Sequence, residues 1–296
     1  MEVFLVIILL IAIPDLSSSV FIITSLTIDA FQKKSVSPLN QILISLNVSN
    51  VSFTIVMSVY LATNSIWSYL YRVGFVFPFI SYVTVCTITS SAWLTAALCF
   101  FYFTKIAPPW PGLLMKIKSK INVLTWRLIL LVETVSLSVS FLSLAASGPH
   151  PNEKNSTAIE VETLENKMKK IKISNVVLVL NFLPFTLIII MTVTSAWFLR
   201  VYDHQMKTNG TLVNTNVKDY QSAVHTMMGL LVLYLITILA IVLMALETFV
   251  DYSVGSWICL MILLLFPTGQ STLLIYSNPK LKQNLREQFN LLSCRA

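Results

Sequence analysis

Charged residues and glycines are scarce in this sequence, and the usual signatures of catalysis are missing. Of the 296 residues only 11% are charged and seven are glycine. No GxGxxG, GxxxxGKS/T, HExxH or GxSxG pattern occurs, and the four cysteines show no CxxC spacing. These absences argue against nucleotide-binding proteins, zinc enzymes and serine hydrolases. We therefore expect no enzyme activity, no cofactor and no metal site.

Apolar residues dominate instead. They make up 56% of the chain, and the mean hydropathy is +0.78, which is too high for a soluble domain of this length. A bilayer core of about 30 Å needs roughly 20 helical residues per crossing. Seven stretches are long and apolar enough to cross: residues 3–29, 39–62, 75–103, 122–145, 174–199, 220–246 and 256–276.

This pattern predicts an all-α membrane protein, with a bundle of seven transmembrane helices over residues 1–276 and a cytoplasmic tail over residues 277–296. The first stretch lacks a basic leading region, carries Glu2 and is too long for a cleavable signal peptide, so we expect it to remain as a helix. In the tail, leucine and phenylalanine recur near helical spacing, which predicts a short amphipathic helix along the membrane surface.

Basic residues are distributed unevenly between the predicted loops. The loops after the first, third and fifth stretches, together with the tail, hold thirteen Lys and Arg residues, and the opposite loops hold six. The positive-inside rule therefore predicts a multi-pass plasma membrane protein with an extracellular N-terminus and a cytoplasmic C-terminus. The outer loop 146–173 contains the sequon Asn155-Ser156-Thr157, so we expect a glycan on Asn155. Contact with anionic membrane lipid accounts for the net charge of +7, and we expect no nucleic acid partner.

The outer half of the third stretch is rich in hydroxyl groups. Thr84, Thr87, Ile88, Ser91 and Thr95 share one helical face, which we expect to look into the bundle. Hydroxyls within lipid also bond the carbonyls of their own helix, so each is either a pocket residue or a packing residue. As a group they outline a mixed polar and apolar pocket.

Two segments point to a known family. Residues 101–107 read FYFTKIA and follow Trp93 and Leu98, and residues 266–283 read FPTGQSTLLIYSNPKLKQ. The first is similar to the helix 3 pattern W…L…FYFLKIA of type 2 taste receptors, and the second is similar to their helix 7 pattern YPSGHSxILIxxNxKLKQ. The chain thus resembles the bitter taste receptor family of G-protein-coupled receptors, and the similarity extends over nearly every helix.

The resemblance implies a receptor that binds small, mostly apolar bitter-type agonists in the outer half of the bundle and a heterotrimeric G protein at the inner face. Together with the hydroxyl-rich face of helix 3, it predicts six ligand-binding residues: Thr84, Ile88, Ser91, Thr237, Trp257 and Leu260. Five residues are candidates for the G-protein-facing surface: Tyr102, Lys105, Lys218, Tyr220 and Lys280. Each of these five is either a G-protein contact or an interfacial anchor.

The sequence departs from the family at several positions within the helices. The family's helix 2 Arg is absent, and Asn50 stands in its place. We expect Asn50, with Ser19 and Ser271, to take over the hydrogen bonds that join helices 1, 2 and 7, because buried amides and hydroxyls still need partners in lipid. Gln270 also replaces the usual His of helix 7.

Four further residues in the apolar stretches have two interpretations each. Asp15 and Glu133 have no obvious partner in the sequence, so each is either functional or a packing residue. Pro184 and Pro267 interrupt the fifth and seventh stretches, and each is either a hinge or an ordinary proline of a membrane helix.

Two alternatives to a bitter receptor remain open. A vomeronasal type 1-like chemosensory receptor also lacks the common receptor motifs, but is less similar to the two segments above. A multispanning transporter belongs to a different class, and the odd helix count, the few intramembrane charges and the lack of an internal repeat disfavour it.

Overall fold

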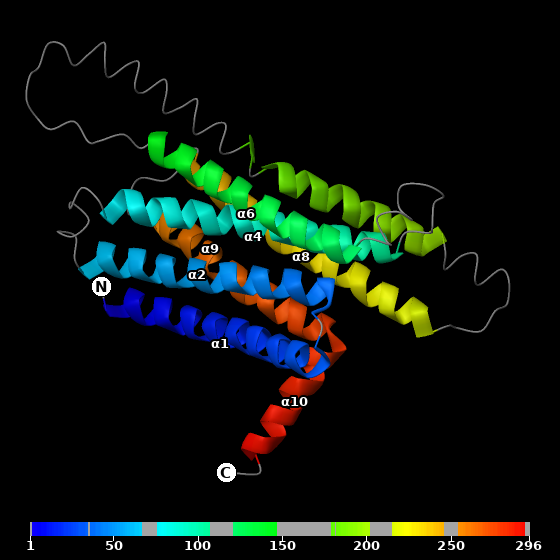
Figure 1. The fold of residues 1–296 in the computed structure, drawn as a ribbon. Helices are drawn as coiled ribbons and strands as arrows, with labels where there is room; N and C mark the ends of the chain where they lie inside the picture. The colour runs from blue at the N-terminus through cyan, green and yellow to red at the C-terminus, as the bar shows by residue number, and fades with distance from the viewer. Residues whose placement is uncertain are drawn as a thin grey trace, which may run out of the picture.

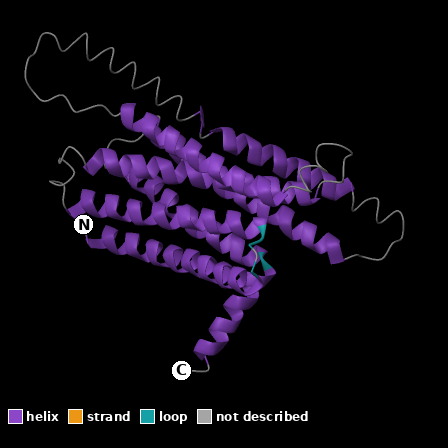
Figure 2. Cartoon of the chain, viewed as in Figure 1, coloured by secondary structure: helices purple, strands orange, loops and turns teal. Residues whose placement is uncertain are grey.

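The computed structural model describes residues 2–34, 36–66, 76–106, 121–146, 179–180, 182–201, 215–245 and 254–293. Within these ranges the chain is helical apart from a few turn and loop residues (Figure 1, Figure 2). Seven of the described helices are long and apolar enough to cross a membrane. The predicted all-α fold with seven transmembrane helices is therefore confirmed.

Seven helices form the bundle, and their bounds lie within a few residues of the predicted stretches: α1 (Glu2–Lys33), α2 (Pro38–Ile66), α4 (Val76–Ile106), α6 (Ile121–Ala146), the helix Phe182–Val201, α8 (Thr215–Ala245) and α9 (Val254–Ser277). A shorter helix, α10 (Pro279–Ser293), follows. The predicted fifth stretch begins at residue 174, which lies outside the described residues.

Neighbouring helices pack side by side in the bundle (Figure 1). α1 packs against α2 and α9, α2 against α4, α4 against α6 and α8, and α8 against α9. α10 leaves the bundle at an angle from the end of α9. We refer to the end where α9 meets α10 as the α10 end, and to the end where α1 begins as the N-terminal end.

Apolar side chains cover the outside of the bundle as well as its interior. Ile22, Leu46 and Leu230 are 0% exposed in the core, whereas Leu10 is 65% and Phe141 68% exposed. In water an exposed apolar surface of this kind would promote association. Lipid tails solvate it, and the helices satisfy their own backbone groups. The exposed apolar surface is therefore the membrane-facing side.

α8 and α9 approach closely at two glycines. A Cβ added to Gly229 would lie 2.8 Å from Leu273 Cδ2, and one added to Gly269 would lie 3.1 Å from Leu233 Cδ2. Each glycine thus faces a leucine of the other helix. Small residues let membrane helices pack at short distance, where van der Waals contact stabilises their association.

Replacing Gly229 with valine should destabilise the fold by about 1–3 kcal/mol, because the branched side chain overpacks the space that Leu273 fills. Thermal unfolding of the purified protein in detergent measures the effect. Met228→Val, at a neighbouring position that is 47% exposed, is the control and should keep the midpoint of the wild type. Equal midpoints for the two variants would contradict the close packing of α8 on α9.

α10 is held against the bundle at its first turn. Asn278 interrupts the helical run, and its Oδ1 accepts the backbone N–H of Lys280 at 3.1 Å. Lys280 Nζ lies 3.6 Å from Asp29 Oδ2 of α1. Leu281 is buried in the core, with Leu285 packed against it. Part of the predicted amphipathic stripe is therefore covered by the bundle itself.

Candidate functional site

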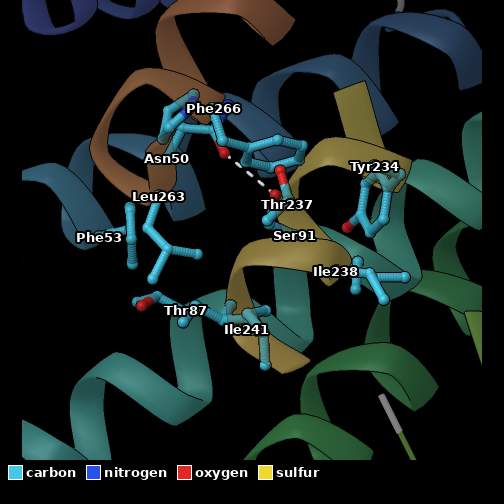
Figure 3. A pocket seen from close by; sticks show the side chains of 13 residues that line it. Asn50, Phe53, Thr87, Ser91, Tyr234, Thr237, Ile238, Ile241, Leu263 and Phe266 are labelled. Atoms are coloured by element: carbon cyan, nitrogen blue, oxygen red, sulfur yellow. Dashed lines mark hydrogen bonds between the residues drawn. The ribbon is translucent and has the colours of Figure 1, made fainter. Parts of the chain in front are cut away.

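A pocket lies between α2, α4, α8 and α9 (Figure 3). The empty space inside it, including the part that is open at the mouth, is about 530 Å³. Eight apolar residues line it: Phe53, Ile88, Ala92, Ile238, Ile241, Leu263, Phe266 and Pro267. Five polar residues complete the lining: Asn50, Thr87, Ser91, Tyr234 and Thr237. None of these described lining residues carries a charge.

Helical spacing brings the lining residues together. Along α8, Tyr234, Thr237, Ile238 and Ile241 are three, four and seven residues apart, so they share one face. The residues from α2, α4 and α9 are spaced in the same way, and Figure 3 shows the labelled side chains around one common space. Most of them lie between the middle of their helix and the N-terminal end of the bundle. The pocket therefore occupies that half of the molecule.

Two lining residues at the floor of the pocket, Asn50 and Ser91, belong to a ring of hydrogen bonds that joins α2, α4 and α9. Ser91 Oγ donates to Asn50 Oδ1 at 3.1 Å, the bond drawn dashed in Figure 3. Asn50 Nδ2 donates to Gln270 Oε1 at 3.0 Å, and Gln270 Nε2 donates to Thr95 Oγ1 at 2.7 Å. Thr95 Oγ1 donates to the carbonyl of Ser91 at 2.7 Å. We call these four buried residues the Gln270 ring.

A second buried group joins α1, α2 and α9. The hydroxyls of Ser19 and Ser271 are 3.0 Å apart, and Ser271 donates to Asn47 Oδ1 at 3.2 Å. The carboxylate of Asp15 accepts hydrogen bonds from Thr54 of α2 and from Ser19. All five side chains are 0% exposed, and we call them the Asp15 cluster. Because Gln270 and Ser271 are adjacent, α9 connects the cluster to the ring.

The hydrogen bonds predicted between Ser19, Asn50 and Ser271 differ from the observed ones in the residue that α2 contributes. Ser19 and Ser271 do bond each other, but the α2 partner of Ser271 is Asn47. Asn50 bonds Gln270 instead. The physical reason is axial position, since residues three apart on a helix are offset by about 4.5 Å along its axis. Asn47 and Asn50 therefore meet successive residues of α9.

The two membrane acids do have partners. Asp15 lies in the cluster just described, and Ser90 Oγ of α4 donates to Glu133 Oε1 of α6 at 2.8 Å. Each acid thus joins its own helix to a neighbouring one. Groups of three or more His, Cys, Asp or Glu side chains able to hold a metal ion do not occur among the described residues.

Three of the six predicted ligand-binding residues, Ile88, Ser91 and Thr237, line the pocket. Trp257 and Leu260 instead pack around a second buried cluster that also contacts Ile88. This cluster lies toward the N-terminal end and includes Ile8, Phe53, Met57, Leu61 and Leu264. Thr84 lies one turn before Ile88 on α4, outside the lining set.

Sequence reasoning missed much of the pocket wall. Ile241, Leu263 and Phe266 lie in largely apolar stretches, where nothing in the pattern separates an inward from a lipid-facing residue, and Phe53 lies three residues after Asn50 on α2. One usable signal was Asn50, because a polar side chain in the middle of a membrane helix is expected to face the bundle interior. Its neighbours at helical spacing could then have been assigned to the same face.

A buried polar contact lies at the α10 end. Thr226 Oγ1 of α8 donates to Ser277 Oγ of α9 at 2.6 Å. The hydroxyl of Tyr102 on α4 also interacts with Ser277, and Tyr102 is 9% exposed. One residue of α9 therefore contacts both α4 and α8 at this end.

The other residues predicted to face a G protein also lie at the α10 end. Lys105 is exposed and Tyr220 is half-buried. Lys280 is exposed and pairs with the α1 carboxylate described above. The side chain of Lys218, and the whole of the predicted glycosylation site Asn155, lie outside the described residues.

Seven apolar helices define a multi-pass membrane protein, and residues of four of them line an uncharged pocket. A family model described as taste receptor protein (TAS2R) matches residues 1–293. The chain therefore belongs to the taste receptor type 2 family, as the resemblance predicted, and so to a class of receptors.

Individual relatives agree with this assignment. Taste receptor type 2 member 39 of Mus musculus is 30% identical over 283 residues, which cover 88% of this chain and 84% of the relative. The member 39 protein of Rattus norvegicus is 30% identical over 270 residues, with coverages of 86% and 82%. Taste receptor type 2 member 40 of Gallus gallus is 26% identical over 208 residues, with coverages of 66% and 64%.

Proposed function

We propose that this chain is a G-protein-coupled receptor that detects small, mostly apolar bitter-type compounds and activates a heterotrimeric G protein at the α10 end. The agonist binds in the pocket between α2, α4, α8 and α9. Family membership supports the receptor class. The uncharged, largely apolar lining supports the ligand class, because a neutral ligand is easily desolvated whereas an ion buried without a partner is strongly destabilised.

The observation that carries the proposal is that the pocket floor belongs to the polar network that joins the helices. Asn50 and Ser91 line the pocket and are members of the Gln270 ring. A ligand that moves either side chain disturbs bonds between α2, α4 and α9. α9 then continues to Ser277, which contacts α4 and α8 at the α10 end. An agonist activates in this way only if it binds the active arrangement more tightly than the resting one.

Five residues at the α10 end are the proposed G-protein contacts: Tyr102, Lys105, Lys218, Tyr220 and Lys280. The exposed ammonium of Lys105 and the surface position of Lys280 support direct contact. The burial of Tyr102 favours an indirect role, in which the contact between its hydroxyl and Ser277 couples a movement of α9 to α4.

A calcium assay tests the function. Cells that express the chain with a promiscuous G-protein α subunit are exposed to a panel of neutral bitter compounds. Concentration-dependent calcium release is expected, and cells without the chain should remain silent. Uptake of a compound that needs no G protein, without calcium release, would instead identify a transporter.

We also infer that the N-terminal end is extracellular, because the loops at the α10 end hold most of the basic residues. This orientation predicts one glycan, on Asn155. Asn155→Gln should remove the shift in gel mobility that glycosidase treatment also removes. Asn209→Gln, at a sequon in a predicted cytoplasmic loop, is the matched control and should leave mobility unchanged. A shift that survives Asn155→Gln, or disappears in Asn209→Gln, would contradict the orientation.

A further inference from the structure

We propose that the pocket selects neutral ligands that donate a hydrogen bond, such as phenols and secondary amides, over otherwise identical ligands that only accept one. The inference rests on the proposed function and refines its ligand class. It follows from where each hydroxyl group of the lining donates its hydrogen.

The hydroxyl hydrogens of the pocket are already engaged within the protein. Thr87 Oγ1 donates to carbonyls of its own helix at 3.0 Å, and Thr237 Oγ1 donates to the carbonyl of Leu233 at 2.8 Å. Ser91 Oγ donates to Asn50 Oδ1 at 3.1 Å. A hydroxyl has one hydrogen and two lone pairs, so these three side chains can offer a ligand only acceptor oxygens.

Tyr234 adds no free donor. Its hydroxyl interacts with Thr95 and Ser91, and the hydrogens of both those hydroxyls are donated elsewhere. The hydrogen in this contact therefore comes from Tyr234. Among the described lining side chains, the remaining donor is the second hydrogen of Asn50 Nδ2, whose first hydrogen bonds Gln270.

The backbone of α9 supplies another acceptor. Pro267 lies inside this helix and has no N–H, so the carbonyl four residues earlier, that of Leu263, lacks its helical donor. Both residues line the pocket. The side chain of Thr268 does not repair the defect, because its buried Oγ1 has no hydrogen-bond partner among the described residues.

The lining thus offers acceptor oxygens from α4, α8 and α9 against a single free N–H. A ligand O–H or N–H can meet one of these oxygens without breaking an internal bond. A ligand that can only accept places its own acceptor atom against the acceptor oxygens of the lining. No hydrogen bond forms between them, and a buried acceptor without a donor is destabilising. A protonated amine also donates, but none of the described lining residues is a carboxylate that could offset its lost hydration. Neutrality is therefore part of the proposal.

Matched pairs of small aromatic compounds test the selectivity in the calcium assay. The pairs are 4-phenylphenol with its methyl ether, and acetanilide with its N-methyl derivative. Each donor should be about tenfold more potent than its methylated partner, which is the scale of one hydrogen bond. Equal potency, or a more potent methylated partner, would overturn the inference. So would a receptor that responds to other bitter compounds and to neither pair.

A receptor that responds to nothing in the wider panel would instead contradict the proposed function. The two failures are therefore distinguishable.

Substitutions at Thr237, one of the acceptor residues, test whether the selectivity for donors arises in this pocket. Thr237→Val keeps the shape of the side chain and removes its oxygen, so the potency of the donor compounds should fall about three- to tenfold while that of the methylated compounds stays unchanged. Thr237→Ser restores the oxygen and should restore the potency. Thr272→Val makes the same change on an exposed face of α9, where the hydroxyl likewise bonds its own helix, and should change neither. An equal loss for both members of each pair in Thr237→Val would mean lost packing and would overturn the assignment.

Discussion

Gln270→Leu should lower the stability of the receptor by about 2–4 kcal/mol, taking roughly 0.6–1.7 kcal/mol for each membrane hydrogen bond. The side chain bonds Asn50 and Thr95, at 3.0 Å and 2.7 Å, and also lies 3.5 Å from the donating hydroxyl of Ser91. Leucine has a similar size but leaves Asn50 Nδ2 without its acceptor and Thr95 Oγ1 without its donor, both of them buried. Thermal unfolding of the purified receptor in detergent should show a midpoint lower by roughly 4–10 °C.

The same substitution should impair signalling, because Gln270 bonds Asn50, which lines the pocket. We expect the agonist concentration for half-maximal calcium release to rise at least tenfold at equal surface expression. Gln270→His, which keeps one donor and one acceptor, should lie between Gln270→Leu and the wild type. Thr272→Val, two residues along on an exposed face, is the control for both measurements. Wild-type stability and response in Gln270→Leu would show that the ring does not hold α2, α4 and α9 together.

The second large effect is expected at Asp15, which is 0% exposed and accepts bonds from Thr54 and Ser19. Asp15→Leu removes both acceptors in the membrane interior and should destabilise the receptor by about 2 kcal/mol. Asp15→Asn keeps an oxygen for Thr54 and provides an N–H for the oxygen of Ser19. It should therefore cost less than half as much in the same unfolding assay.

Asp29 provides the matched comparison, because it lies on the same helix in exposed ion pairs with Lys33 and Lys280. Exposed pairs of this kind contribute about 0–1 kcal/mol, so Asp29→Leu should be much milder than Asp15→Leu. If Asp15→Leu is as stable as the wild type, or loses no more stability than Asp29→Leu does, the Asp15 cluster does not stabilise the packing of α1 against its neighbours.

The number and type of helices could be predicted because the membrane imposes one simple rule, that each crossing needs a long apolar run. The errors lie at helix ends. α8 begins at Thr215, five residues before the predicted stretch, and α2 ends at Ile66, four residues after it. The extra turns are mostly polar, as in residues 215–219. Hydropathy marks where a helix leaves the bilayer, whereas the backbone hydrogen bonds continue into the water.

The residue pattern itself predicted pocket residues on α4, whereas Thr237 of α8 was predicted from the family resemblance. α4 places Thr87 and Ser91 on one face, and both line the pocket as the hydroxyl pattern predicted. α8 and α9 are apolar around most of their circumference, so the inward faces depend on how the helices rotate against each other. Asn47 and Asn50 illustrate the limit: both were visible as polar residues, but only the packed register decides which one meets Ser271.

Filling the pocket is the most direct test of the central claim, that agonist acts between α2, α4, α8 and α9. Ala92 is 3% exposed and lines the pocket on α4, so Ala92→Phe places a ring where the ligand would bind. Ile241→Phe fills the space from α8 and provides an independent variant. Val232→Phe adds the same ring on α8 at a position that is 52% exposed, and is the control.

The measurement is calcium release in response to an agonist of the wild type, at matched surface expression and after unfolding midpoints have been compared. The account predicts that at least one correctly folded filling variant loses the response, by 100-fold or more in agonist concentration, while Val232→Phe responds as the wild type does. Folded, surface-expressed Ala92→Phe and Ile241→Phe receptors that both respond at wild-type concentrations would contradict it.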